Sequence, residues 1–253
     1  MMNRGMFTCL AVVFLGSAVV ADAQETLAER LYRSYTAIQS LSYELRKETT
    51  VSGKTVRTIA TVQYRKPGLL HVRNSAPIER MIVIDGARLY YRQQGLDRVF
   101  ARPIPELTGD WARMARTVPG TPMENLDRLQ GLAEIELPRG PRGRTRRGYP
   151  AGTVFVVLFV DTDHNLTRME FYKSAAMTEL TGHYEYGAYI EATPGCRLPR
   201  LHRGTAIVKG EEVRETKRLT NVVVNKPLSM TLFDAGRYFG DEEFVSSFPE
   251  LFD

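Results

Sequence analysis

The sequence predicts a mainly β protein with a few helices, built as a meander of antiparallel strands. Segments rich in β-branched and aromatic residues recur along most of the chain, several of them alternating apolar with polar residues. Turn-forming pairs separate the segments, and Asp85-Gly86 is among the strongest short hairpin signals. Because the strands follow one another as hairpins, we expect the sheet to roll up and protect its edges.

The first residues are typical of a secretory signal. Arg4 supplies a positive charge, an apolar run extends from Cys9 to Val20, and a small-x-small pattern ends at Ala23. The apolar run has about a dozen residues, whereas a membrane-spanning helix needs about 20. We therefore expect a signal peptide over 1–23, cleaved after Ala23, and a single domain over 24–253.

The number of cysteines indicates the cellular compartment, and the distribution of charge indicates which kinds of partner to expect. Cleavage would leave only Cys196, in a predicted loop, and an exported protein without an internal disulfide favours the bacterial periplasm. The net charge is +5, with the positive excess concentrated over 138–148. This arginine-rich segment is predicted to be a mobile surface loop. Attraction to anionic lipid headgroups is the alternative. No aromatic residues are interleaved for base stacking, so nucleic acid is not an expected partner.

The elements can be predicted in chain order. A helix is expected from Glu25, because apolar residues there recur at spacings of three and four. Strands are expected over 41–51, 55–65, 69–73, 80–84, 88–93, 98–102, 132–137, 154–160, 166–173, 178–190, 201–209 and 213–225. The segment 154–160 is continuously apolar, which predicts a strand that is buried on both faces.

Proline and glycine residues interrupt the strand pattern between 103 and 120. Asp110 is predicted to cap one short helix, and Thr121-Pro122 to begin a second. Helices inserted between hairpins would form a lid or simply cover an open side of the core. At the C-terminal end, an acidic run over 241–243 precedes Phe244 and Phe248, which are expected to dock loosely.

The sequence holds no recognisable catalytic or metal site. None of its four histidines has a second histidine or a cysteine at metal-ligand spacing. His164 lies in a segment rich in Asp and Asn, which favours a hairpin turn over a metal loop. Neither a Gly-x-Ser-x-Gly elbow nor a phosphate loop is present. We expect no enzyme activity, cofactor or metal, although a triad assembled from distant residues would escape such a search.

Two stretches together resemble the LolA-like proteins, which are periplasmic carriers and sorting factors for outer-membrane lipoproteins. In the first, the turn in Tyr64–Arg73 (YRKPGLLHVR) leads into a strand, and the Asp-Gly hairpin of Met81–Tyr91 (MIVIDGARLYY) follows. In the second, Asn221–Leu228 (NVVVNKPL) leads to Leu232-Phe233.

The resemblance implies an incomplete, curved antiparallel β-barrel with helices over its concave side. Its apolar cavity would take acyl chains of lipoproteins or lipids for transfer toward the outer membrane, without covalent chemistry. The implied partners are an inner-membrane donor, an outer-membrane acceptor and, transiently, the membrane surface. The alternative function is a periplasmic module that senses lipids or lipoproteins and contacts a membrane signalling protein.

Alternation along the strands supplies candidates for the cavity lining, for which ordinary core packing is the alternative. The candidates are Val56, Ala60, Val62, Tyr64, Leu70, Val72, Ile82, Ile84, Leu89, Tyr91, Phe159, Met169 and Phe171. The lid candidates are Trp111, Met114 and Leu126.

Overall fold

The computed structural model describes residues 25–240 and 242–252. The predicted signal peptide and its cleavage after Ala23 therefore lie outside the described residues, as does Asp241 of the acidic run. Within the described ranges, no helix combines the length and the apolar character that crossing a membrane requires.

Strands make up most of the described chain. The strands are β1 (Ser40–Val51), β2 (Lys54–Arg65), β3 (Leu69–Ala76), β4 (Arg80–Ile84), β5 (Arg88–Gln93), β6 (Arg98–Pro103), β7 (Ile135–Leu137), β8 (Thr145–Ala151), β9 (Val154–Val160), β10 (Leu166–Tyr172), β11 (Leu180–Thr193), β12 (Cys196–Val208), β13 (Glu211–Val224) and β14 (Glu243–Val245). The α-helices are α1 (Leu27–Tyr35), α2 (Gly109–Arg116), α3 (Met123–Leu126) and α4 (Gly236–Phe239). Short 3₁₀ helices are η1 (Ile104–Glu106), η2 (Asp127–Leu129), η3 (Pro141–Gly143), η4 (Met230–Phe233) and η5 (Pro249–Phe252).

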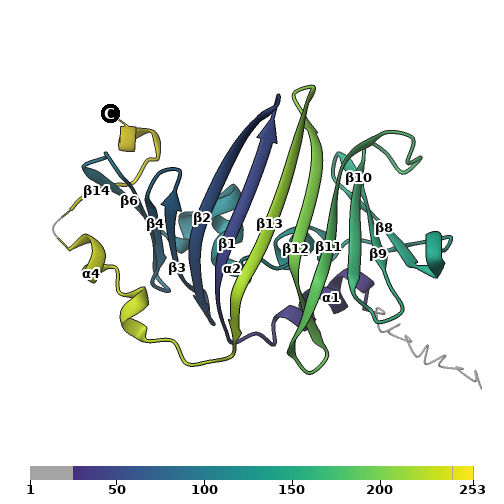
Figure 1. The fold of residues 1–253 in the computed structure, drawn as a ribbon, viewed down its shortest axis with the longest axis horizontal. Coiled ribbons are helices and arrows are strands. Elements are labelled where there is room, and N and C mark those ends of the chain that lie inside the picture. Colours follow the sequence, from purple (N-terminus) through teal and green to yellow (C-terminus); the bar gives the residue numbers. More distant parts are fainter. Residues whose placement is uncertain (1–24, 241, 253) are drawn as a thin grey trace, which may run out of the picture.

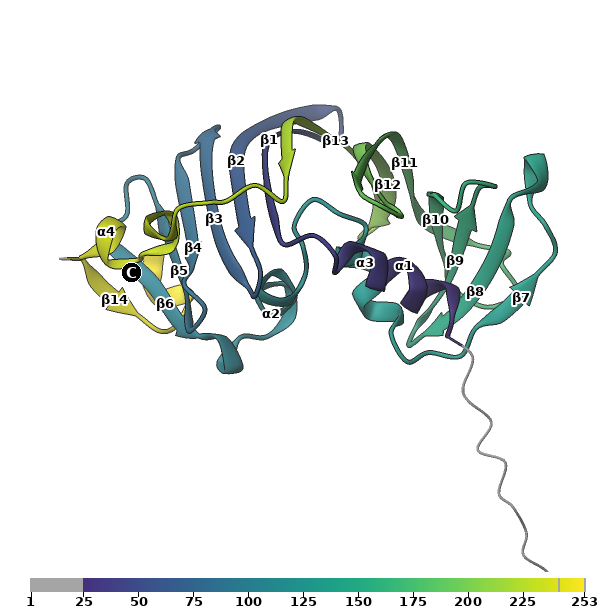
Figure 2. The same ribbon diagram turned by 90° about the horizontal axis from the view of Figure 1, so that it is seen from below.

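All strands of the described residues belong to one sheet, in the order β14-β6-β5-β4-β3-β2-β1-β13-β12-β11-β10-β9-β8-β7. The chain starts at the centre with β1, builds one half outward to β6, and crosses to the far edge through 104–134. It then builds the other half inward until β13 pairs with β1. All neighbours are antiparallel except β14 and β6. Figure 1 shows the long central strands, and Figure 2 shows the sheet as an arch with α1, α2 and α3 on its inner side.

The predicted first helix is present as α1. Thr26 caps it: its hydroxyl accepts a hydrogen bond from the Glu29 amide, and the Glu29 carboxylate accepts one from the Thr26 amide. One face of the helix, which includes Leu31 and Tyr35, is buried against the inner side of the sheet. The apolar spacing in the sequence thus located the helix that covers the inner face of the half of the sheet containing β8 to β12.

The predicted turns and the doubly buried strand are also confirmed. Asp85 Oδ1 accepts hydrogen bonds from the amides of Ala87 and Arg88, both at 2.8 Å, and this closes the β4–β5 hairpin. His164 lies in the β9–β10 turn, whose geometry is set by Asp161 Oδ1, the acceptor of the Asn165 amide at 2.8 Å. Strand β9 buries alternate residues in the inner core and in a separate cluster on the outer face.

Three local predictions are wrong. Asp110 does not cap α2, because the helix begins at Gly109 and Asp110 lies within its first turn. The second half of the predicted mobile arginine loop is strand β8, because neighbours neutralise and pack its arginines. Arg147 forms an ion pair with Glu134 at 2.9 Å, and the Arg146 guanidinium lies 5.2 Å from the centre of the Phe159 ring. Cys196 begins strand β12 and is buried, not in a loop. Burial raises the pKa of its thiol.

Candidate functional site

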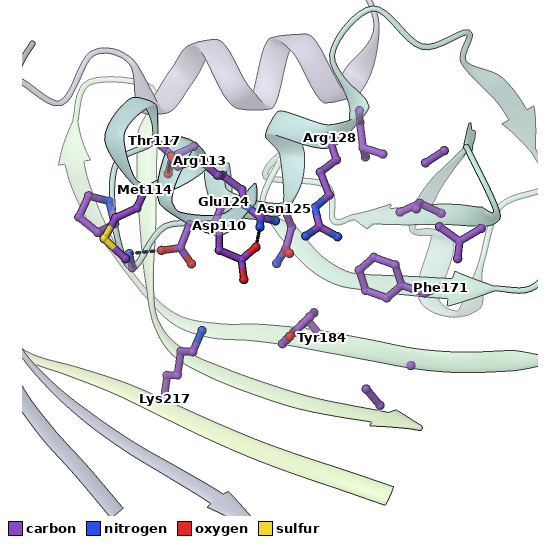
Figure 3. Close-up of a pocket in the computed structure, with 18 of the residues that line it drawn as sticks. Asp110, Arg113, Met114, Thr117, Glu124, Asn125, Arg128, Phe171, Tyr184 and Lys217 are labelled. Atoms are coloured by element: carbon purple, nitrogen blue, oxygen red, sulfur yellow. Dashed lines mark hydrogen bonds and ion pairs between the residues drawn. The ribbon is translucent and has the colours of Figure 1, made fainter. Parts of the chain in front are cut away.

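A cavity of about 820 Å³ lies between the inner face of the sheet and the crossover segment that carries α2, α3 and η2. Figure 3 shows the crossover above the cavity and the strands below it. The volume falls in the range of about 300–1,000 Å³ that is usual for small-molecule sites. Most of the residues that line the cavity on its sheet side are apolar.

Both halves of the sheet supply the apolar walls. One wall is formed by Leu45, Val62, Leu70, Val72 and Ile82, from strands β1 to β4. The opposite wall is formed by Leu129, Leu132, Val154, Val156 and Phe171. A chain lying in the cavity would therefore contact hydrocarbon on both sides, while α2 contributes Met114 from above.

Charged side chains also line the cavity. Glu124 and Arg128 approach from the crossover, and Lys217 rises from β13 on the sheet (Figure 3). Asp110 and Arg113 of α2 are paired with each other. Burial alone would lower the pKa of Lys217, but the carboxylates of Glu124 and Glu215 outweigh burial and raise it. The ammonium group is therefore charged at neutral pH.

The predicted lining residues separate into three groups. Those that line the cavity are Val62, Leu70, Val72, Ile82 and Phe171, with Met114 from the predicted lid. Those packed in the inner core instead are Tyr64, Ile84, Leu89, Tyr91, Met169 and Leu126. Ala60 is buried opposite Leu45 on β1.

Three predicted residues lie away from the cavity. Val56 is 53% exposed near the β1–β2 turn, where the long strands extend beyond the helices. Phe159 points to the outer face and packs with Phe155 and Val157. Trp111 packs with Tyr91, Phe100 and Phe248 in an aromatic cluster beside the lining.

Sequence reasoning missed the polar part of the site. It also missed two tyrosines on the sheet, Tyr43 and Tyr184. Lys217 lies in a run of mixed charges, and no pattern marks it as the residue that faces inward. Finding it would have required the β1–β13 pairing, which joins segments from opposite ends of the chain.

His202 lies buried on β12, beside the cavity wall. A ring nitrogen shares a hydrogen bond of 3.2 Å with the Pro199 carbonyl, which places the proton on that nitrogen, and the ring packs edge-on against Tyr186. Burial, reinforced by the nearby Lys217 ammonium, lowers the pKa of His202 to about 4. The folded protein therefore holds this imidazole neutral, whereas the unfolded chain protonates it near pH 6.5.

The protein is expected to lose stability through His202 as the pH falls from about 6.5 to about 4. Protons then bind the unfolded chain preferentially, and this lowers the free energy of unfolding by up to about 1.4 kcal/mol per pH unit. Above pH 6.5 the contribution is fully present. Urea unfolding should be measured at pH 7.5 and at pH 4.5 for the wild-type protein and His202→Gln. The free energy of unfolding should fall between these pH values by about 2 kcal/mol less in His202→Gln than in wild type. His164→Gln, in an exposed turn, is the control; equal losses in wild type and His202→Gln would contradict the prediction.

No group of three or more His, Cys, Asp or Glu side chains arranged to hold a metal ion occurs among 25–240 and 242–252. The lining instead combines hydrocarbon walls with a few charges. Such an arrangement suits noncovalent binding of an amphipathic molecule.

Comparison with solved structures relates this architecture to known proteins. A LolA superfamily protein from Nitrosomonas europaea matches with a TM-score of 0.55 at 14% identity, covering 84% of this chain and 100% of the other. A putative outer membrane lipoprotein-sorting protein domain from Vibrio parahaemolyticus matches with a TM-score of 0.57 at 9% identity, covering 83% and 96%. A DUF1329 family protein from Desulfovibrio piger gives 0.54 at 14% identity, covering 83% and 95%. No protein-family model matches the sequence, and no curated protein matches it. At these identities the likeness concerns the fold, and it confirms the predicted incomplete, curved antiparallel barrel.

Proposed function

We propose that this chain, whose fold is LolA-like, is a carrier that binds the acyl chains of lipoproteins or lipids in its cavity. The observation that carries the proposal is the cavity itself, with hydrocarbon walls from both halves of the sheet. Each methylene removed from water contributes about 0.8 kcal/mol, so such a cavity favours acyl chains strongly. No covalent step is part of the proposal.

The route of the cargo is part of the same proposal. Export by the predicted signal peptide would place the carrier in the periplasm, between an inner-membrane donor and an outer-membrane acceptor. Arg139 and Arg142 are exposed in the β7–β8 connection. Such basic residues would favour transient contact with an anionic membrane surface, at about 1 kcal/mol each.

Displacement of a fluorescent 16-carbon fatty acid tests the carrier function. A triacylated lipopeptide should displace the probe, and the same peptide without acyl chains should not. Ile82→Glu places a charge on the partly exposed apolar wall, and about tenfold weaker probe binding is expected. Ile59→Glu is the matched control, because Ile59 lies 44% exposed on the opposite face of the sheet and should bind like wild type. Failure of the wild-type protein to bind the probe or the lipopeptide would refute the proposal.

A further inference from the structure

The charges on the cavity wall do not balance. The lining contains three cations, Arg113, Arg128 and Lys217, against two acids, Asp110 and Glu124. Because Arg113 is paired with Asp110, Glu124 is the one lining carboxylate that remains to balance Arg128 and Lys217. The Glu124 carboxylate also accepts the Gly120 amide at 3.3 Å, which holds it at the start of α3. One positive charge remains in excess.

Of these cations, Arg128 has the fewest ion-pair and hydrogen-bond partners. Within 25–240 and 242–252, neither an ion pair nor a hydrogen bond joins its guanidinium to another residue. Figure 3 shows it reaching down from the crossover beside Asn125, toward the space above Tyr184. A guanidinium offers five donors in a planar fork, which matches a carboxylate or a phosphate.

Lys217 faces the cavity from the sheet, and its partner carboxylate is shared with a second lysine. Glu215 is shared between two lysines: its carboxylate lies 2.6 Å from Lys47 Nζ and 3.1 Å from Lys217 Nζ. The side chain of Lys47 is 33% exposed, that of Glu215 is 17% exposed and that of Lys217 is 23% exposed. One carboxylate between two ammonium groups neutralises Lys217 only in part, so the single excess positive charge of the lining remains.

Part of the sheet floor, four residues along β12 from the position opposite Lys217, is made of small residues. Gly182 and Ala206 line the cavity there. Gly204 lets the Tyr184 ring lie against its strand, since a Cβ at Gly204 would come within 2.5 Å of Tyr184 Cε1. Small residues therefore leave the floor low beside Tyr184.

We infer that the cavity selects amphipathic ligands with an anionic end, a carboxylate or a phosphate held between Arg128 and Lys217 while the chain lies on the apolar wall. The inference rests on the proposed acyl-chain function and adds the chemistry of the headgroup. A purely hydrocarbon cargo would cover the Arg128 guanidinium without pairing it, which is costly. An anionic end supplies the missing partner.

Three ligands with the same 16-carbon chain test the inference: hexadecyl phosphate, palmitate and the uncharged hexadecanol. Each competes against the fluorescent fatty acid at low salt. The wild-type protein should bind the two anions about tenfold more tightly than hexadecanol, as expected for one or two charge-assisted hydrogen bonds. The stronger of the two anions indicates whether phosphate or carboxylate is the natural headgroup.

The variants locate the headgroup site. Arg128→Gln and Lys217→Gln should each reduce the anion preference about threefold to tenfold and leave hexadecanol binding unchanged. Arg30→Gln, an exposed arginine on α1, is the control for charge alone. Because Arg128 is exposed and unpaired, its replacement tests the site even if Lys217→Gln fails to fold.

The outcomes separate the two proposals. Equal wild-type affinity for all three ligands would overturn the headgroup inference and leave the acyl-chain function standing. A preference that persists in both variants would overturn the assignment to Arg128 and Lys217. Failure of every 16-carbon ligand to bind would overturn the acyl-chain function itself.

Discussion

Replacing Glu134 by alanine is expected to lower the free energy of unfolding by about 3 kcal/mol, because this carboxylate fastens helix α1 to the sheet. Glu134 Oε2 accepts a hydrogen bond of 2.6 Å from the Leu27 amide, at the first turn of α1. The Tyr149 hydroxyl donates to the same oxygen, and Arg147 pairs with Oε1 at 2.9 Å. A carboxylate at a helix N-terminus also complements the helix dipole.

The loss would be large because the groups left behind are buried. Tyr149 is fully buried, and its hydroxyl also accepts the Ala28 amide at 3.0 Å. Burial and the hydrogen bond to Glu134 raise the pKa of Tyr149 far above its usual value, so the hydroxyl stays protonated and continues to need an acceptor. Without Glu134, that hydroxyl and the Leu27 amide both lose their partner.

Urea unfolding measures the effect, and hydrogen exchange at the α1 amides shows whether the helix is released first. Glu136→Ala is the matched control, because Glu136 also pairs with Arg147, at 3.2 Å, but its side chain is 81% exposed. Its loss should cost less than about 1 kcal/mol. Equal stability of the two variants would contradict the anchoring role of Glu134.

The elements that the sequence predicted well are those specified by neighbouring residues. The Asp85-Gly86 turn and the first helix, which the structure shows to be capped by Thr26, depend on contacts within a few positions. The strand order is different, because β1 pairs with β13 and the chain crosses the inner face between the two halves. A meander of sequential hairpins describes each half but not how the halves join.

The cavity was harder to predict, because alternation identifies a face of the sheet but not the position along it. Ile82 and Ile84 point to the same face of β4, yet Ile82 lines the cavity and Ile84 is fully buried. Val56 and Val62 differ in the same way on β2, since only Val62 lies beneath the crossover. In β9 every residue is apolar, so alternation gave no sign that Phe159 faces outward.

A protein that ends after Glu242 is expected to lose about 4 kcal/mol of folding free energy, because the removed segment closes one end of the arch. Strand β14 pairs in parallel with β6, the outer strand of that half. Val245, the last residue of β14, and Leu251, in the segment that follows, are both buried in the core. Figure 2 shows the yellow segment wrapped around this end of the sheet.

An aromatic cluster makes the loss measurable. The Phe248 ring centre lies 5.4 Å from that of Tyr91 and 5.9 Å from that of Trp111. Trp111 is the only tryptophan in the sequence, so its fluorescence reports on this cluster alone. Truncation should shift the emission to longer wavelength and lower the midpoint of urea unfolding. It would also bare the β6 edge, which favours association that increases with protein concentration.

A matched pair of phenylalanines separates packing inside the arch from pairing at its edge. Phe248→Ala should reproduce the fluorescence shift and cost about 2 kcal/mol, because the ring packs against the inner core. Phe244→Ala should leave the emission unchanged and cost less than about 1 kcal/mol, because Phe244 is 50% exposed on β14. If truncation leaves both the emission and the unfolding midpoint at their wild-type values, the segment does not close the arch. If only Phe248→Ala fails to shift the emission, the β14–β6 pairing would account for the stabilisation, and the aromatic cluster would contribute little.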